Sequence, residues 1–517
     1  MLKLSFLHSL LLSVYPIVFL YSVNADQLKF KEVLLPSAIS LGITSAILIL
    51  LRIVLKSLEK AALITTAWLF LFFSYGAFHE SFKSMFGFEA SRTLIFPCLW
   101  IFVFLASTLA LVKNKTNSVH ITMFLNVVAI MLVAMTGFNI ILQAVATPEI
   151  NISTNTDAQP TPKSQKIASA SPDIYYIILD GYARNDILQS IYDFDNSAFT
   201  TALTQKGFYI ASQSCANYCQ TYLSLASSLN FQYLDELKKN YANINSVEPL
   251  IKMIAANKTF AALKKRGYQT IAFSTGHSGT ELKNADKFLG REMIGREFLN
   301  VLLNSTFLSA LRTSVFDLTE TQVQVHRNRV NEVFATLPEL HGTIDKPVFV
   351  FAHVICPHPP FVFGANGERI EFEGTFNLLD GSHWKGNKNK YKTLYLNQLK
   401  YISAQALQAI SRLMKKNKRE KVIILQSDHG PGSGLDWQSA DNTNLPERMS
   451  ILNAYYFSDR DYSMLSPEIS PVNTFRILQN KYFGSNLQQL PNHSYFSKWW
   501  GRYNFIDVTE QVQIKAE

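Results

Sequence analysis

Long apolar stretches separated by short polar ones dominate the first 147 residues. Each apolar stretch is close to the roughly 20 residues that a helix needs to cross the hydrocarbon core of a bilayer. One such stretch alone is also typical of a buried helix in a soluble protein, but five in succession favour membrane spans. The expected spans are Leu4–Val23, Val33–Leu55, Ala61–Phe78, Leu94–Val112 and Ile121–Leu142.

From Pro172 onward, short apolar runs alternate with amphipathic stretches of helical period. The runs Asp173–Leu179, Pro347–Ile355 and Lys421–Gln426 are mostly apolar, as expected of strands that are buried on both faces. Alternation of such strands with helices predicts an α/β domain with a mainly parallel sheet and helices on both faces. The other predicted elements are strands at Gly207–Ser212 and Tyr268–Ser274 and helices at Asn185–Lys206, Thr259–Arg266, Arg327–Leu337 and Tyr395–Met414.

A polar stretch rich in Ser, Thr, Asn, Ala and Pro connects the two patterns, and its composition is that of a flexible linker. The sequence therefore predicts a transmembrane helical domain, a linker, an α/β domain and a C-terminal tail. Their expected bounds are 1–147, 148–171, 172–485 and 486–517.

The charged residues say little about binding partners, but their distribution predicts the orientation of the chain in the membrane. The chain is 48% hydrophobic and only 17% charged, and its net charge of +9 is scattered without a basic run. We therefore expect no nucleic-acid partner. Positive charge gathers in the loops that follow spans two and four, which places the N-terminus inside and residues after span five outside. The residues concerned are Arg52, Lys56, Lys60, Lys113 and Lys115.

Two features weaken this orientation signal or offer an alternative to it. Lys29 and Lys31 would lie on the outer side, against the rule. The small-residue sequence Val23-Asn24-Ala25 resembles a signal-peptide cleavage site, although the apolar run before it is long for a signal peptide. Cleavage there would leave the α/β domain on the same side of the membrane.

Two predicted strands end in acidic residues. Asp180-Gly181 follows the first strand, and Asp428-His429-Gly430 follows the strand Lys421–Gln426. In open α/β sheets, ligands bind at the carboxyl ends of the strands. One Asp-Gly pair is most often a simple turn, but two such strand ends together predict a metal site.

Thr221 begins an apolar helix within a hydroxyl-rich segment. Free N–H groups and the helix dipole favour an anion at this position. Beside a divalent cation, such a hydroxyl is activated as a nucleophile. From this segment alone, a helix N-cap without chemistry is the stronger interpretation.

Three histidines lie in or after predicted strands. His358 lies in a proline-stiffened loop that follows a strand, which favours a role in the site. His277 follows another strand in a glycine-rich segment and is a weaker candidate. His353 lies inside its strand and is expected in the core.

The order of these motifs resembles the sulfatase-like hydrolase/transferase family of the alkaline phosphatase superfamily. Five spans followed by an external domain resemble the lipoteichoic acid synthases and the phosphoglycerol or phosphoethanolamine transferases of that family. The motifs are Ile-Leu-Asp180-Gly, Gln-Thr221-x-x-Ser224, Pro-His358-Pro, Ser-Asp428-His429-Gly and Ser470-Pro-Val-Asn-Thr-Phe-Arg476.

The resemblance implies a role for each residue. It makes Thr221 the nucleophile and a metal ligand together with Asp180, Asp428 and His429, and it makes His358, with His277 as a second candidate, a contact to the substrate. Carboxylates and an imidazole suit one Mn²⁺ or Zn²⁺ ion better than Ca²⁺. The implied reaction moves a phosphorylated head group from a phospholipid donor, through phospho-Thr221, to an envelope glycan or lipid acceptor.

One departure from the family pattern concerns sulfate esters. Sulfatases carry Cys or Ser followed by x-Pro-x-Arg and convert it to formylglycine, whereas Cys219 is followed by Gln-Thr-Tyr-Leu. Formylglycine chemistry is therefore disfavoured. Cys215 and Cys219 could form a disulfide or remain buried thiols, and geometry decides between the two.

The main hypothesis is thus a multi-pass transferase of the cytoplasmic membrane, with its catalytic domain on the periplasmic or extracellular side. Alternatives are a phosphate- or sulfate-ester hydrolase of the same fold and a catalytically inactive membrane scaffold. A transporter ranks last, because the spans hold almost no charged residues away from their ends.

Overall fold

A computed structural model of the chain divides into two compact units. The first comprises Met1–Asn151 and Met293–Leu318, and the second comprises Ile152–Glu292 and Thr319–Glu517. Except for Ser171, the expected linker at 148–171 lies outside the described residues. The structure describes residues 4–23, 30–86, 95–113, 119–146, 171–242, 245–290, 296–310, 318–341, 344–371, 376–384, 386–416 and 419–512.

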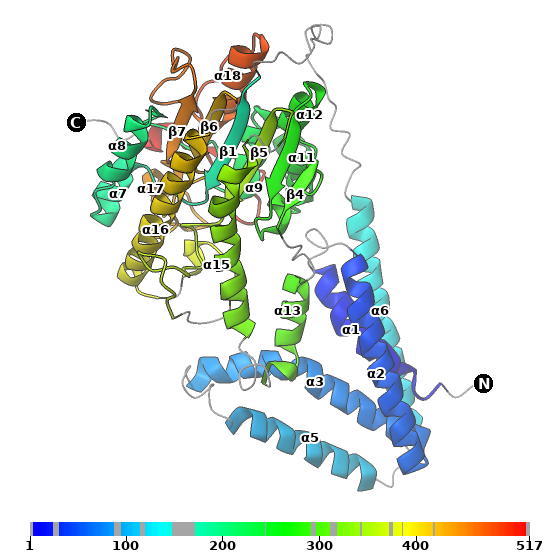
Figure 1. Cartoon of the computed structure of the whole chain (residues 1–517). Helices are drawn as coiled ribbons and strands as arrows, with labels where there is room; N and C mark the ends of the chain where they lie inside the picture. The colour runs from blue at the N-terminus through cyan, green and yellow to red at the C-terminus, as the bar shows by residue number, and fades with distance from the viewer. Residues whose placement is uncertain are drawn as a thin grey trace. The chain divides into compact units, whose positions relative to one another are not determined.

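The first unit is a set of apolar helices (Figure 1). Its helices are α1 (Leu7–Ser22), α2 (Lys31–Leu55), α3 (Leu58–Phe86), α5 (Ile95–Lys113), α6 (Val119–Ala146) and α13 (Arg296–Ser305). Among the described residues, α2, α3, α5 and α6 are long and apolar enough to cross a membrane. The first expected span, Leu4–Val23, forms α1, whose 16 residues make it shorter than the other four.

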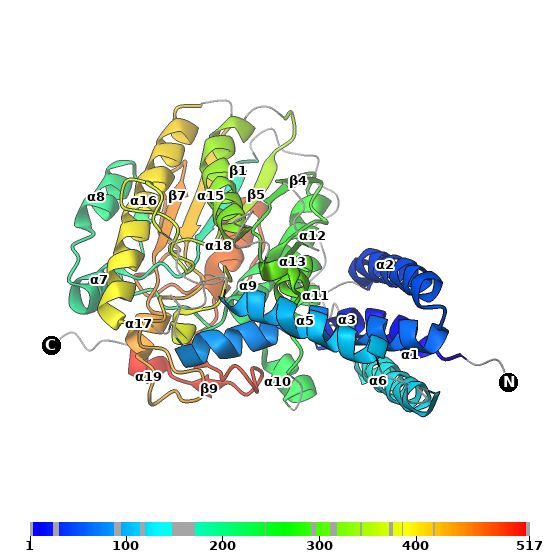
Figure 2. The same cartoon turned by 90° about the horizontal axis from the view of Figure 1, so that it is seen from below.

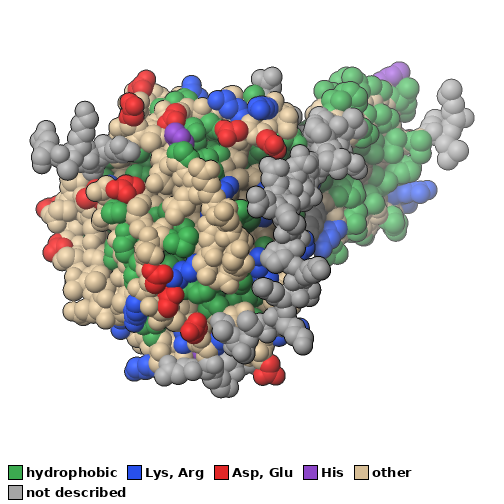
Figure 3. All heavy atoms as spheres, turned by 90° about the horizontal axis from the view of Figure 1, so that it is seen from above, with side chains coloured by type: hydrophobic (Ala, Val, Ile, Leu, Met, Phe, Trp, Pro, Cys, Tyr) green, Lys and Arg blue, Asp and Glu red, His purple; other side chains and the backbone are tan. Residues whose placement is uncertain are grey.

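The surface of these helices is apolar rather than charged. Figure 3 shows nearly continuous hydrophobic side chains on them, whereas charged side chains are spread over the second unit. Most of the large hydrophobic residues that are exposed belong to α2, α5 and α6. Water cannot stabilise such a surface, but lipid can, so this is a membrane protein.

A seven-stranded sheet forms the centre of the second unit, in the order β2-β7-β6-β1-β5-β3-β4. Its strands are β1 (Asp173–Leu179), β2 (Tyr209–Ile210), β3 (Gln269–Phe273), β4 (Lys287–Leu289), β5 (Val348–Val354), β6 (Lys421–Gln426) and β7 (Asn453–Phe457). The five strands from β6 to β4 are parallel, and β7 and β2 add an antiparallel edge. The predicted mainly parallel α/β fold is confirmed.

Helices cover both faces of this sheet, which explains why β1, β5 and β6 are buried at every residue and are mostly apolar. In Figure 1, α15 and α16 lie in front of the strands, whereas Figure 2 shows α9 and α11 on the other side. The helices are α7 (Asn185–Tyr192), α8 (Ser197–Gln205), α9 (Thr221–Asn230), α10 (Asp235–Tyr241), α11 (Glu248–Ala255), α12 (Lys258–Lys265), α15 (Leu318–Thr336), α16 (Lys388–Met414), α17 (Leu445–Met449), α18 (Pro471–Phe483) and α19 (Thr509–Val512).

Several predicted elements differ from the structure. The helices expected over Arg327–Leu337 and Tyr395–Met414 begin nine and seven residues earlier, in α15 and α16. The helix expected over Asn185–Lys206 is broken into α7 and α8, because Asp193 adopts a left-handed conformation that ends the first helix. The strand expected over Gly207–Ser212 pairs at only two residues, since β2 lies at the edge of the sheet and pairs only with β7. Beyond α18, the hairpin of β8 (Tyr495–Phe496) and β9 (Ile506–Asp507) packs on the domain.

Candidate active site

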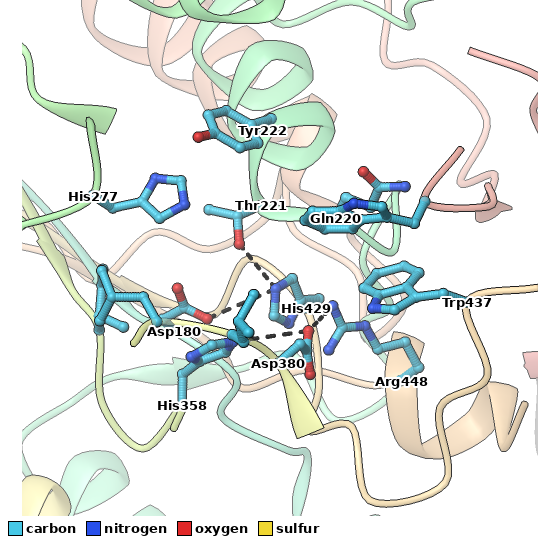
Figure 4. A pocket seen from close by; sticks show the side chains of 14 residues that line it. Asp180, Gln220, Thr221, Tyr222, His277, His358, Asp380, His429, Trp437 and Arg448 are labelled. Carbon is cyan, nitrogen blue, oxygen red and sulfur yellow. Dashed lines mark hydrogen bonds and ion pairs between the residues drawn. The ribbon is translucent and has the colours of Figure 1, made fainter. Parts of the chain in front are cut away.

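The parallel pairing of β1 with β6 brings two acidic strand ends together. Ile178 of β1 lies opposite Gln426 of β6, so the residues that follow both strands emerge at one edge of the sheet. Ligand atoms of Asp180, Asp428 and His429 lie within 4.8 Å of one another, and all three residues are buried. Figure 4 shows two of the three, Asp180 and His429, next to each other in the pocket wall.

This cluster fits a metal ion. Asp180 Oδ1 and Asp428 Oδ2 are buried and accept no hydrogen bond from the part of the chain that the structure describes. A buried carboxylate oxygen without a donor is costly unless a cation compensates it. Two carboxylates and one imidazole form a donor set suited to a divalent transition metal.

His429 is oriented to offer a lone pair to this cluster. Its Nδ1 lies 2.9 Å from the carbonyl oxygen of Gly430, which can only accept a hydrogen bond, so Nδ1 carries the proton. Nε2 is then free of a proton. Burial, together with the nearby charge of Arg448, lowers the pKa of His429 and keeps the ring neutral.

Thr221 faces the same imidazole. Its Oγ1 lies 3.0 Å from Nε2 of His429, and it is the first residue of α9 (Figure 4). The N-cap residue is Gln220, so the alternative that Thr221 is the N-cap is wrong. Ser224, one turn later, donates its hydroxyl proton to the carbonyl oxygen of Asp428 at 2.8 Å and ties α9 to the loop after β6.

His358 reaches the pocket from the loop after β5. Its backbone N–H donates to the carbonyl oxygen of Asp180 at 2.9 Å, and its Nδ1 donates to that of Pro359 at 2.5 Å. Burial opposes protonation of the ring, but the charges of Asp180 and Asp380 outweigh it and raise the pKa of His358 to about 9. This side chain can therefore present a positive charge to an anionic substrate.

His277 also lines the pocket but differs in charge. Its ring centroid lies 4.8 Å from that of Tyr222, the residue after Thr221. Burial and the neighbouring His353 lower the pKa of His277 to about 4. It is therefore neutral, and it can contact a substrate without adding charge.

His353 is buried in β5, where a core position was expected, but it also contacts the site. Its Nε2 donates to Oδ2 of Asp180 at 3.1 Å, and its Nδ1 lies 3.1 Å from the hydroxyl of Thr280. These contacts orient the Asp180 carboxylate so that Oδ1 points into the cluster. A histidine one residue before the end of a strand that pairs with β1 is the only signal the sequence offers for this role.

Sequence reasoning missed a buried ion pair in the pocket wall. Nη2 of Arg448 lies 2.7 Å from Oδ2 of Asp380. Burial alone would raise the pKa of Asp380, but the charge of Arg448 outweighs it and holds that pKa well below its usual range. Trp437 and Trp499 complete the aromatic part of the wall. Asp380 and Trp437 lie in loops, Trp499 lies in the tail and Arg448 lies in the short helix α17, so no long periodic pattern in the sequence marks them.

Cys215 and Cys219 are free thiols. The Sγ atom of Cys219 is buried and accepts a hydrogen bond from the backbone N–H of Ser497 at 3.2 Å. Cys219 is also absent from the residues that line the pocket, and burial raises the pKa of its thiol. Of the alternatives left open for Cys215 and Cys219, the structure has reduced thiols.

Residues 170–470, more than half of the chain, match the Sulfatase family model. The chain belongs to the sulfatase family. A search of curated protein sequences finds no significant match. Membership of this family, within the alkaline phosphatase superfamily, agrees with the fold and makes the protein an enzyme.

Several solved structures are similar to this sulfatase-family chain. The periplasmic domain of EptC from Escherichia coli in complex with zinc is 13% identical over 67% of this chain and 96% of that domain, with a TM-score of 0.42. The lipooligosaccharide phosphoethanolamine transferase A of Neisseria meningitidis, an integral membrane protein, is 12% identical over 92% of this chain and 95% of its own, with a TM-score of 0.37. The phosphonate monoester hydrolase of Agrobacterium radiobacter is 12% identical over 63% and 80%, with a TM-score of 0.40. Similarity at this level says nothing about a substrate.

Proposed function

We propose that this membrane protein is a metal-dependent transferase that moves a phosphorylated head group from a phospholipid to an envelope acceptor through a phospho-Thr221 intermediate. The observation that carries the proposal is the position of Thr221 Oγ1, 3.0 Å from Nε2 of His429 and beside the buried Asp180–Asp428–His429 cluster. A hydroxyl in that position is suited to nucleophilic attack.

The metal in this proposal is one Mn²⁺ or Zn²⁺ ion held by Asp180, Asp428, His429 and Thr221. A divalent cation bound there would lower the pKa of the Thr221 hydroxyl and offset the charge of a phosphoryl group. The tautomer of His429 suits such a ligand, because its Nε2 keeps the lone pair.

The reaction is a double displacement at phosphorus. Thr221 Oγ1 loses its proton and forms a bond to phosphorus, while the bond from phosphorus to the diacylglycerol oxygen breaks and that oxygen takes up a proton. The Nε2–H of a protonated His358 donates to a non-bridging oxygen as negative charge develops on it, while Nδ1–H stays bonded to the carbonyl oxygen of Pro359. An acceptor hydroxyl then loses its proton and bonds to phosphorus, while the bond from phosphorus to Thr221 Oγ1 breaks and that oxygen takes up a proton.

The identity of the pocket residue favours phosphoryl transfer over formylglycine chemistry. Formylglycine is an aldehyde and forms from Cys or Ser, whereas oxidation of the Thr221 side chain would give a ketone. Cys219, two residues before Thr221, points away toward Ser497 and does not line the pocket. A threonine hydroxyl instead forms a phosphate ester directly.

We further propose that the protein lies in a cytoplasmic membrane with its catalytic unit on the periplasmic or extracellular side. The loops rich in Lys and Arg support this orientation. Four apolar helices in the same chain would keep the enzyme at the bilayer that contains its lipid donor.

The first test is the intact mass of full-length protein after incubation with Mn²⁺ or Zn²⁺ and a mixture of phosphatidylethanolamine and phosphatidylglycerol. We expect a mass gain that equals one phosphorylated head group, and its value identifies the donor. Thr221→Ala should show no gain, and Thr221→Ser, which keeps the hydroxyl, should restore it. No gain with either metal and either lipid, in rapidly quenched samples as well, would contradict the transferase.

A hydrolase of the same fold is the second candidate, because water could replace the acceptor at the same phospho-Thr221. The same samples decide between them when the released product is analysed. Free phosphoethanolamine or phosphoglycerol formed at the rate of lipid consumption indicates a hydrolase. A Thr221→Ala protein that retains the full phenotype of the wild type in cells would favour the inactive scaffold instead.

A further inference from the structure

One segment of the chain between β4 and α15 packs among the apolar helices. Residues Met293–Leu318 group with the first unit, although the chain before and after them belongs to the second. The backbone N–H of Phe307 donates to the carbonyl oxygen of Phe72 in α3 at 2.8 Å. This insertion, of which 296–310 is described, is therefore attached to α3 by its main chain.

Gly76 makes this close contact possible. A Cβ atom at position 76 would lie 2.2 Å from the carbonyl oxygen of Asn304 and 2.7 Å from Cα of Ser305. Both are backbone atoms, which cannot rotate away as a side chain can, so the observed approach requires glycine at this position. The backbones of α3 and α13 are thus fitted to each other.

The insertion carries apolar side chains beyond those that it buries against the apolar helices. Phe298 and Leu302 are buried in one cluster with Ile17, Tyr21 and Val33 of α1 and α2. In contrast, Leu299, Val301 and Leu308 are 39%, 50% and 38% exposed. With the sequence REFLNVLLNS, α13 is amphipathic, and Leu299 and Val301 lie at the two margins of the stripe that buries Phe298 and Leu302. The apolar stripe is therefore wider than its contact with α1 and α2, as is typical of an amphipathic helix that also contacts lipid.

Its length and connections restrict how it can enter a bilayer. The ten residues of α13 are about 15 Å long at 1.5 Å per residue, which is half of the roughly 30 Å hydrocarbon core. Both ends of the insertion continue into the second unit, so it must enter and leave on the same side. We propose that residues 296–310 form a re-entrant segment in the leaflet on the side of the catalytic unit, with hydrocarbon covering Leu299, Val301 and Leu308.

Each of the five apolar helices has a residue near one end that clusters with the insertion, and these five ends indicate the side of the membrane on which the insertion lies. The ends concerned are the end of α1, the start of α2, the end of the apolar window of α3, the start of α5 and the end of α6. If successive helices cross the membrane in alternate directions, all five ends fall on one side. The last of them leads into the catalytic unit, so that side is the catalytic one. The residues are Tyr21, Val33, Tyr75, Phe96 and Ile140.

The consequence is a second attachment of the catalytic unit to the membrane, besides the connection after α6. A re-entrant segment in the lipid leaflet would hold the unit at the interface even if residues 147–170 were extended. This proposal does not depend on the chemistry proposed for Thr221, and its tests measure no catalysis.

Lipid contact is tested with full-length protein in nanodiscs that contain brominated phospholipids, which quench a bimane label only by contact. Single cysteines replace Leu299, Val301 or Leu308 in a Cys98→Ser background, because Cys98 is the exposed native cysteine. We expect a blue-shifted emission and strong quenching at all three positions. Glu468→Cys, at an exposed position of the second unit, is the unquenched control. Equal, weak quenching at all four positions would overturn the proposal.

Docking on α3 is tested by a second pair of variants. Cysteines at positions 72 and 307 should be joined by a short bifunctional maleimide in the membrane-bound protein. Gly76→Leu should abolish this crosslink, because its side chain would occupy the backbone of α13. Gly137→Leu is the matched control, since no atom lies within 4 Å of a Cβ there, and the crosslink should remain. A crosslink that survives Gly76→Leu unchanged would contradict the docked position.

Discussion

Arg448 forms a 2.7 Å ion pair with Asp380, and the same guanidinium donates hydrogen bonds to the backbone of two loops of the site. Its Nε and Nη2 donate to the carbonyl oxygen of Cys219 at 2.9 and 2.6 Å, and its Nη1 donates to that of Gly430 at 3.1 Å. One loop leads to Thr221, and the other follows His429. Arg448 therefore ties the loop before Thr221 to the loop after His429, although it hydrogen-bonds to neither of these two side chains.

We predict that Asp380→Asn is strongly destabilising. Removing the carboxylate leaves the Arg448 guanidinium, which is 1% exposed, without a counter-charge. Breaking a buried pair in this way costs about 3–5 kcal/mol. Thermal unfolding of the protein in detergent should show a clear fall in Tm, whereas Asp441→Asn, at an exposed position, should leave Tm unchanged. An unaltered Tm for Asp380→Asn would show that the pair is not formed.

His353→Phe should weaken metal binding without touching a ligand. The substitution removes the hydrogen bond to Oδ2 of Asp180 but keeps an aromatic ring in the strand. Loss of such an orienting partner typically lowers metal affinity by about 10–100-fold. Competition with a chromophoric chelator measures the change. His341→Phe is the matched control, because His341 contacts the buried Asp173 at 2.8 Å, outside the pocket, and its loss should leave the affinity unchanged.

Asp428→Asn should change stability in opposite directions with and without metal. In a chelator, the wild type holds two close buried carboxylates, and neutralising one of them should keep or raise Tm. With Mn²⁺ or Zn²⁺ at 100 times its dissociation constant, binding should stabilise the wild type by about 2.7 kcal/mol, and the variant should lose this gain. Differential scanning fluorimetry in both conditions makes the comparison. A metal-induced rise of equal size in both proteins would exclude Asp428 as a ligand.

We predict that the buried His326 makes the free energy of unfolding depend on pH. Burial lowers the pKa of this ring to about 3, whereas an unfolded histidine titrates near 6.5. Between these values the unfolded chain binds the extra proton, so the folded state loses stability as the pH falls below 6.5. The loss between pH 7 and pH 5 should be about 2 kcal/mol from this group.

The measurement is urea unfolding at pH 7 and at pH 5 for the wild type and His326→Phe, which keeps a ring of similar size. We expect the variant to lose less stability on acidification than the wild type, by the amount given above. The same pH dependence in both proteins would mean that His326 is not neutral and buried in the folded state.

Much of the site follows from local patterns in the sequence. An apolar run that ends in Asp180 and another that ends in Asp428-His429 predict two buried strands with ligands at their carboxyl ends. Parallel strands present those ends at the same edge, so the cluster could be inferred before its geometry was known. The apolar helices are equally local, because about 20 apolar residues in a row suffice to predict a membrane span.

The remaining features arise from contacts between distant parts of the chain. Arg448 and Cys219 are separated by 229 residues, and Asp180 and His353 by 173. No periodic pattern in the sequence marks either contact, because the packing of whole helices and strands brings these residues together. The same holds for Gly76, an ordinary glycine within an apolar helix until the backbone of α13 lies against it.

By itself, then, the sequence determined the class of fold, the apolar helices and the residues that could bind a metal, since these depend on the period and length of local runs. Only the tertiary structure decided that Arg448 holds the two loops, that His353 orients Asp180 and that the insertion after β4 packs with the membrane helices. Those contacts form when hydrophobic burial has already assembled the elements, so side chains far apart in the chain become neighbours without any local signal.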